Sequence, residues 1–156
     1  MSLRRKKHLL GFSILELAVV MIIVSLVISI TVPGFTYLVD SAKIKESESS
    51  METLIADIDA YFKTNGQYPD SLVEVFGEVP LDEWGNPYQY LRIDGGSIKG
   101  KGKLRKDKNL VPINSDYDFY SMGPDGKSTS PLTAALSKDD IIRGRNGSFL
   151  GLAEDF

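Results

Sequence analysis

The chain has 156 residues, with 18 Lys and Arg, 21 Asp and Glu, one histidine and no cysteine, and its formal net charge is −3. Without cysteine it forms no disulfide. Because the one histidine is His8, the rest of the chain lacks the residues for Ser-His or Cys-His nucleophiles and for a His/Cys zinc site.

The first predicted element is an apolar helix over residues 12–32. Four basic residues at 4–7 precede it, and its only charge is Glu16. About 20 residues at a rise of about 1.5 Å each cross the hydrocarbon core of a bilayer, so this run predicts a membrane-spanning helix. The basic cluster keeps its N-terminal end cytoplasmic. A carboxylate costs roughly 2.5–3.5 kcal/mol at the centre of such a helix and less toward its end, so Glu16 needs a partner.

The helix is predicted to continue beyond the membrane. Pro33 should kink it, because proline removes a backbone hydrogen bond. Apolar side chains then recur with helical spacing and predict an amphipathic half. They are Met51, Leu54, Ile55, Ile58, Tyr61 and Phe62. Asn65-Gly66 is a typical helix end, so we expect one helix from Phe12 to about Thr64.

The remaining sequence predicts short elements. Ser71 should cap a short helix that ends near Phe76. Aromatic and aliphatic runs at 88–93 and 117–122 predict strands, and 110–113 is a weaker candidate whose proline suits a sheet edge. The predicted fold class is α+β: a long kinked N-terminal helix packed on a small antiparallel sheet, with a loop-rich C-terminal region.

Residues 99–108 are strongly basic. A run of this kind with interspersed glycines predicts a solvated loop, and ion pairs with a neighbouring subunit or contacts with DNA are the alternatives. The basic residues are Lys99, Lys101, Lys103, Arg105, Lys106 and Lys108.

Gly11, Phe12 and Glu16 stand in the order of a known processing signal. The pattern resembles the class III signal of type IV pilins and pseudopilins, in which a basic leader ends in Gly, Phe follows and Glu lies four residues further on. This resemblance implies that a prepilin peptidase cuts between Gly11 and Phe12, that the new N-terminus of Phe12 is methylated, and that the helix is retained. Pro33 also matches the family. An uncleaved membrane anchor is the alternative.

The resemblance divides the chain into three parts: a leader at 1–11, a transmembrane and filament-core helix at 12–33, and a periplasmic head at 34–156. Loss of the leader leaves 14 basic and 21 acidic residues, a formal net charge of −7. An acidic mature chain argues against binding to nucleic acid.

Glu16 has two interpretations. Ser13 and Glu16 have the spacing of a capping box, which would satisfy N–H groups at the start of the helix. Alternatively, the resemblance implies that Glu16 faces the amine of Phe12 in a neighbouring subunit, where breaking the pair costs roughly 3–5 kcal/mol. Both can hold at different stages.

Three further segments resemble the major pseudopilin of type II secretion. They are YFKTNGQYPDSL at 61–72, DEWGNPYQY at 82–90 and YDFYSMGPDG at 117–126. Glu83 departs from the family, which usually has proline before the tryptophan. We expect Trp84 and the tyrosines to serve in packing.

This resemblance implies a non-enzymatic structural subunit of the inner membrane that is extracted into a homo-oligomeric periplasmic filament driving protein export. The implied partners are minor pseudopilins, the prepilin peptidase and N-methyltransferase, and the inner-membrane assembly platform. A type IV pilin for adhesion, motility or DNA uptake is the alternative. A membrane-tethered carboxylate enzyme built on Asp82, Glu83 and Asp116 is a remote one.

The resemblance also implies one Ca²⁺ ion that ties the C-terminal loop. Carried over by position, its ligands are Asp125, Asp139, Asp140 and the backbone carbonyl of Met122, oxygen donors of the kind that calcium prefers. Residues 127–138 separate the two halves of the site by more than the family pattern. Ser128 or Ser130 could replace a ligand, or the site is altered or lost. The alternative is a solvated loop followed by an Asp N-cap of a short helical turn.

Overall fold

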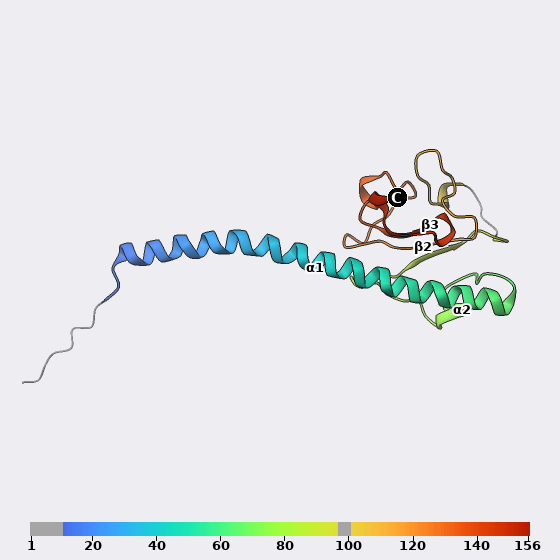
Figure 1. Ribbon diagram of the computed structural model, residues 1–156, viewed down its shortest axis with the longest axis horizontal. Coiled ribbons are helices and arrows are strands. Elements are labelled where there is room, and N and C mark those ends of the chain that lie inside the picture. Colours follow the sequence, from blue (N-terminus) through green and yellow to red (C-terminus); the bar gives the residue numbers. More distant parts are fainter. Residues whose placement is uncertain (1–10, 97–100) are drawn as a thin grey trace, which may run out of the picture. The chain divides into compact units, whose positions relative to one another are not determined.

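The computed structural model describes residues 11–96 and 101–156. They fall into two compact units, one up to Asp40 and one from Ser41 to Phe156, and the second is called the head below. Helix α1, Ile14–Asn65, runs through both units (Figure 1). Its bounds confirm the predicted long helix to within two residues. The chain is helical through Pro33, and a kink there stays a prediction.

The part of α1 in the head presents the predicted apolar stripe. Met51 and Ile58 are completely buried, and Leu54 and Ile55 pack beside them. Gly66 then adopts a left-handed conformation with φ 73°, and its N–H donates to the carbonyl of Phe62 at 2.8 Å. Glycine takes this conformation without strain, so the helix ends where Asn65-Gly66 predicted.

The head contains one antiparallel sheet of four strands in the order β1-β2-β3-β4. The strands are β1 (Gln89–Arg92), β2 (Tyr117–Ser121), β3 (Ile141–Gly144) and β4 (Phe149–Leu152). In the register, Tyr90 pairs with Phe119, and Ile142 pairs with both Tyr120 and Gly151. The first two strands were predicted.

Two strand predictions were incomplete or wrong. The candidate strand at 110–113 does not form: Leu110 makes only an isolated bridge with Asp107, and its side chain is exposed. The C-terminal region, expected to be loop-rich, contains β3 and β4 besides its loops. These strands are only four residues long, and they depend on pairing, β3 with β2 and β4 with β3, rather than on a pattern of their own.

The sheet is covered on both faces. On one face, Tyr117, Phe119 and Ile141 pack against Met51 and Ile58 of α1. On the other face, Ile142 packs with Ile113, Leu132 and Ala153 from the loops. Figure 1 shows the head part of α1 along one side of β2 and β3 and the loops, drawn in yellow to red, along the other.

The predicted short helix is α2, Val73–Phe76. Ser71 is not its cap: Leu72 holds the N-cap position with helical φ −62° and ψ −26°, and it makes no capping bond through its side chain. A backbone already helical at this point leaves no extended residue whose side chain could turn back to the first N–H groups. Left-handed Gly77, with φ 80°, ends the helix.

Candidate assembly helix and supporting loops of the head

The N-terminal part of α1 is an apolar surface that the described part of the chain does not cover. Ile14–Thr31 is long and apolar enough to cross a membrane, and none of it is buried. Phe12, directly before the helix, is 80% exposed. Uncovered apolar area of this extent is stable only in hydrocarbon or against other apolar helices. Within the described residues it is the one helix with these properties.

The polar groups of this segment are satisfied within the helix. The hydroxyls of Ser25, Ser29 and Thr31 donate to the carbonyls four residues earlier, at 2.7, 2.7 and 2.8 Å. A hydroxyl bonded in this way presents little unmet polarity to its surroundings. These residues are therefore compatible with hydrocarbon or with closely packed helices.

Ser13 and Glu16 form half of a capping box. The Ser13 Oγ accepts from the backbone N–H of Glu16 at 3.1 Å. The carboxylate of Glu16 makes no hydrogen bond or ion pair with residues 11–96 or 101–156, and it lies at the surface. The first capping contact is thus present, and the charge of Glu16 is left for a partner outside the described chain. Gly11 and Phe12, the predicted processing residues, both lie exposed ahead of the helix.

The first resembling segment fastens the end of α1 to the sheet. Tyr68 stacks on Phe62 of α1, with ring centroids 4.3 Å apart, and lies 4.9 Å from the ring of Tyr117 in β2. The hydroxyl of Tyr90 in β1 donates to the carbonyl of Pro69 at 2.8 Å. Packing of this kind, rather than a binding site, is the role predicted for these tyrosines.

The second and third resembling segments are joined through Asp82. Its Oδ1 accepts from the N–H groups of Trp84 and Asn86 at 3.0 and 2.8 Å and so shapes the turn. Its Oδ2 accepts from Ser121 Oγ at 2.5 Å, and the side-chain amide of Asn86 donates to the Gly123 carbonyl at 3.0 Å. The two motifs therefore build one structure from segments far apart in sequence.

The three carboxylates considered for catalysis do not converge. Asp82 is held by the turn just described, whereas Glu83 accepts from Ser50 Oγ at 2.9 Å. Asp116 forms a two-bond pair with Arg143, at 2.9 and 2.6 Å. Each has its own structural partner, so their arrangement offers no shared site for acid and base catalysis.

The structure brings two of the predicted calcium ligands together. The Asp125 N–H lies 3.4 Å from the Asp139 Oδ2, and the carbonyl of Asp139 lies directly against Gly123. Asp125 also accepts from the Lys127 N–H at 2.7 Å, which folds its own loop. Met122 follows β2 directly, so its carbonyl belongs to the same turn.

Asp140 lies in a different environment, completely buried beside Arg105. Its Oδ2 receives Nη2 of Arg105 at 2.5 Å and the hydroxyl of Ser128 at 2.6 Å. Burial raises the pKa of Asp140 to about 6, and the bonds from Ser128 and Arg105 oppose that rise. The carboxylate therefore depends on these two donors to remain charged inside the protein.

These positions fit a calcium site poorly. In the part of the chain that the structure describes, no three acidic side chains come together as a candidate metal cluster. One oxygen of Asp140, Oδ1, is buried without a hydrogen-bond partner there, but a guanidinium holds the other oxygen. A divalent cation would lie beside that positive charge. The calcium ion stays a prediction that these contacts do not support.

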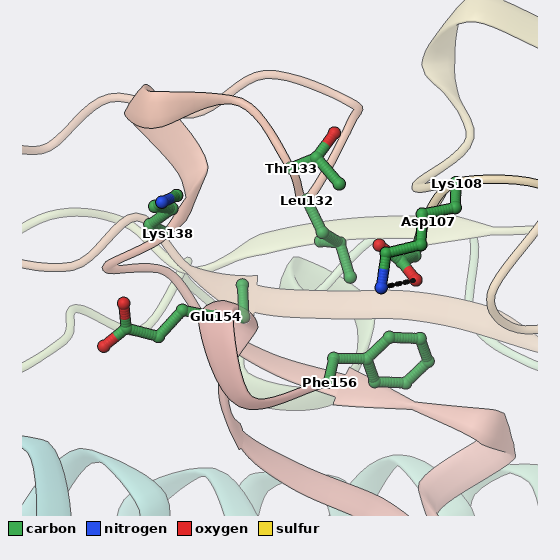
Figure 2. Close-up of a pocket in the computed structure, with 8 residues that line it drawn as sticks. Asp107, Lys108, Leu132, Thr133, Lys138, Glu154 and Phe156 are labelled. Atoms are coloured by element: carbon green, nitrogen blue, oxygen red, sulfur yellow. Dashed lines mark ion pairs between the residues drawn. The ribbon is translucent and has the colours of Figure 1, made fainter.

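One hollow of the head is an open surface feature (Figure 2). Asp107 and Lys108, whose ion pair is 3.9 Å long, lie across from Lys138 and Glu154, and the ring of Phe156 forms part of the wall. Exposed charges of both signs and a single ring do not make a ligand pocket of the usual apolar, enclosed kind. We assign no binding function to it.

Sequence reasoning missed the role of Arg105. It belongs to the basic run expected to be solvated, where Lys103 and Lys108 are indeed exposed, yet Arg105 itself is buried. Lys99 lies outside the described residues. The available signal was Leu104-Arg105, one apolar residue next to one basic residue in an otherwise polar stretch. It does not reveal the partner, which lies 35 residues further along the chain.

The described residues define a class of architecture, an apolar N-terminal helix that continues into a small α+β head, which is the architecture that the resemblance to pilin-like subunits predicts. Comparison with known proteins narrows this class. Over 138 residues the chain is 28% identical to type II secretion system core protein G of Pseudomonas aeruginosa, covering 75% of this chain and 84% of that protein.

A second relative carries the same name. The chain is 27% identical over 145 residues to type II secretion system core protein G of Aeromonas hydrophila, covering 80% of this chain and 89% of that protein. No family model and no solved structure matches the chain. The two relatives confirm the predicted resemblance to the major pseudopilin of type II secretion.

Proposed function

We propose that this chain is a structural, non-enzymatic subunit of a type II secretion pseudopilus, which assembles through its N-terminal helix. The observation that carries the proposal is the apolar surface of Ile14–Thr31, none of which the described residues bury. Copies of this helix packed together would remove that surface from water or lipid, and the head would remain outside the bundle. The names of both relatives favour the secretion filament over an adhesion or DNA-uptake pilus.

The subunit begins as a single-pass protein of the bacterial inner membrane. The basic residues at 4–7 keep the N-terminus cytoplasmic, and the head lies in the periplasm. A prepilin peptidase cuts between Gly11 and Phe12 and methylates Phe12. Exposure of both residues ahead of α1 supports access by such an enzyme.

Cleavage also creates the partner that Glu16 lacks. The amine of Phe12 in a neighbouring subunit supplies a positive charge to a carboxylate that has no partner in the described chain. In apolar surroundings such a pair is formed at each step of assembly, and leaving one partner alone costs roughly 3–5 kcal/mol. Minor pseudopilins and the inner-membrane assembly platform start and extend the filament, whose growth drives protein export.

A substitution at Glu16 tests this assembly model. Glu16→Ala should be inserted and cleaved normally, with a methylated Phe12 found by mass spectrometry of the mature protein, yet yield few filaments and little secreted protein. Glu52→Ala is the matched control, because it removes one exposed carboxylate from the same helix far from the membrane segment. Normal filament yield from Glu16→Ala would contradict the assembly role, and an uncut N-terminus in the unaltered protein would contradict the processing.

A further inference from the structure

We propose that the guanidinium of Arg105 takes the place of a bound cation in the head, so that the loop before β3 is held without a metal ion. This inference rests on the contacts of the head and is independent of the proposed function. It concerns the loop for which the family resemblance implies calcium, and it assigns the loop's positive charge to the chain itself.

Arg105 joins three separate segments. Its Nη2 donates to the Asp140 Oδ2 at 2.5 Å, and its Nη1 donates to the Ser128 Oγ and the Thr129 carbonyl at 2.5 and 2.6 Å. A carboxylate, a hydroxyl and a backbone carbonyl are also the oxygen ligands that surround a hard cation. The guanidinium thus satisfies an oxygen cage of that chemistry with directed hydrogen bonds.

The position of the guanidinium is fixed from several sides. The side chains of Arg105 and Asp140 are 3% and 0% exposed. The guanidinium carbon lies 4.1 Å from the ring centroid of Tyr120. The backbone N–H of Arg105 donates to the Asp118 Oδ2 at 3.0 Å, which fixes the main chain at this residue. The planar guanidinium of arginine suits this site, because it stacks on the ring and donates hydrogen bonds through two nitrogens. The ammonium of lysine has a single nitrogen and could not make the same contacts.

The same contacts disfavour a metal ion at Asp140. Its Oδ2 already accepts two hydrogen bonds, one from Arg105 and one from Ser128. Ser128 is one of the possible replacement ligands, and its hydroxyl is already used in this bond. Asp125 and Asp139 face each other in the neighbouring turn rather than at Arg105. A calcium ion at Asp140 would have to displace the guanidinium or lie beside its positive charge.

The experiment uses the full chain in detergent micelles. Near-ultraviolet circular dichroism follows the melting temperature of the head in excess EDTA and in millimolar calcium, and titration calorimetry measures calcium binding. The unaltered protein should melt at the same temperature in both conditions and show no calcium-binding heat. Arg105→Ala should melt roughly 10 °C lower in EDTA, because it leaves a buried carboxylate unpaired.

Two further variants make the test specific. Lys106→Ala removes the same charge from the next residue, which makes no ion pair within the described chain, and should shift the melting temperature by no more than about 2 °C. If Arg105→Ala fails to fold, the double variant Arg105→Met with Asp140→Leu should fold and melt well above Asp140→Asn alone.

Either of two results would overturn the proposal: a lower melting temperature of the unaltered protein in EDTA, or equal behaviour of Arg105→Ala and Lys106→Ala. Calcium that raises the melting temperature of Arg105→Ala but not of the unaltered protein would support it, because the substitution frees the oxygens that the guanidinium occupies.

Discussion

Replacing Asp82 should separate the two motifs that it joins. The residue is only 6% exposed, and its carboxylate accepts three hydrogen bonds, from the N–H groups of Trp84 and Asn86 and from the Ser121 hydroxyl. Asp82→Ala removes all three bonds and leaves two backbone donors of the turn without their acceptor. At about 1 kcal/mol net for each bond, the free energy of unfolding should fall by about 3 kcal/mol.

Asp82→Asn separates the hydrogen bonds from the charge. An asparagine Oδ1 can still accept from Trp84 and Asn86, and its amide can donate to the Ser121 oxygen. Asp82→Asn should therefore cost about 1 kcal/mol, well below the alanine variant. Glu78→Ala, which removes an exposed carboxylate from the same part of the head, should be near neutral.

The assay is thermal unfolding of the full chain in micelles, followed by the near-ultraviolet signal of the head. A loss of about 3 kcal/mol corresponds to a fall in melting temperature of roughly 10 °C for a head of this size. Equal melting temperatures for the alanine variant at Asp82 and the Glu78 control would refute the reasoning, because they would mean that the turn keeps its shape without the carboxylate.

Two other substitutions test the packing of the head. Gly123→Ala should lower the free energy of unfolding by at least 1–3 kcal/mol in the same melting assay, because φ is 63° there and a Cβ would collide with the Asp139 carbonyl. Gly102→Ala is the control and should be near neutral, because a Cβ at Gly102 would point into open space. Similar losses of stability in both variants would contradict this prediction. Ile58→Ala should lower the free energy of unfolding by about 2–5 kcal/mol, because it opens a cavity under the sheet. Val73→Ala at the surface should change it by less than about 0.5 kcal/mol. A small effect at Ile58 would mean that the apolar stripe of α1 contributes little to the stability of the core.

Local sequence patterns were sufficient for α1 and for the first half of the sheet. The stripe from Met51 to Phe62 repeats with helical spacing, and Gly66 supplies the left-handed residue that ends the helix. β1 and β2 are rich in aromatic residues and lie between turn residues, which is a strong local signal. In each case the information lies within about ten residues along the chain.

β3 and β4 lack such a signal. Every residue of β3 is buried, Arg143 included, so its sequence shows no alternation of apolar and polar residues. The turn between these strands is fixed from elsewhere: the amide of Asn114 donates to the Arg143 carbonyl at 2.9 Å and accepts from the Asn146 N–H at 2.8 Å. These contacts span about 30 residues along the chain, so a pattern search over a short stretch of neighbouring residues cannot find them.

The candidate site divides in the same way. Gly11, Phe12 and Glu16 form a contiguous signal and were predicted directly, whereas the buried pairs of the head join residues distant in sequence. Charge alone placed Arg105 on the surface, because burial of a charge is stable only with a partner in contact. That partner, Asp140, was instead assigned to a metal ion.

The two buried guanidinium groups of the head have a common design on opposite faces of β2. Arg143 lies 4.0 Å from the ring centroid of Tyr117, which points to α1 and donates to Asp59, and Arg105 lies 4.1 Å from that of Tyr120 on the loop face.

Each guanidinium also has a carboxylate, Asp116 for Arg143 and Asp140 for Arg105. Each face of β2 therefore holds one guanidinium between a tyrosine ring and a carboxylate, an arrangement called a clamp below. The clamp of Arg105 holds Asp140, directly before β3, and the clamp of Asp116 holds Arg143, within β3. In a chain without cysteine, these clamps hold the C-terminal hairpin by contacts that do not depend on redox state.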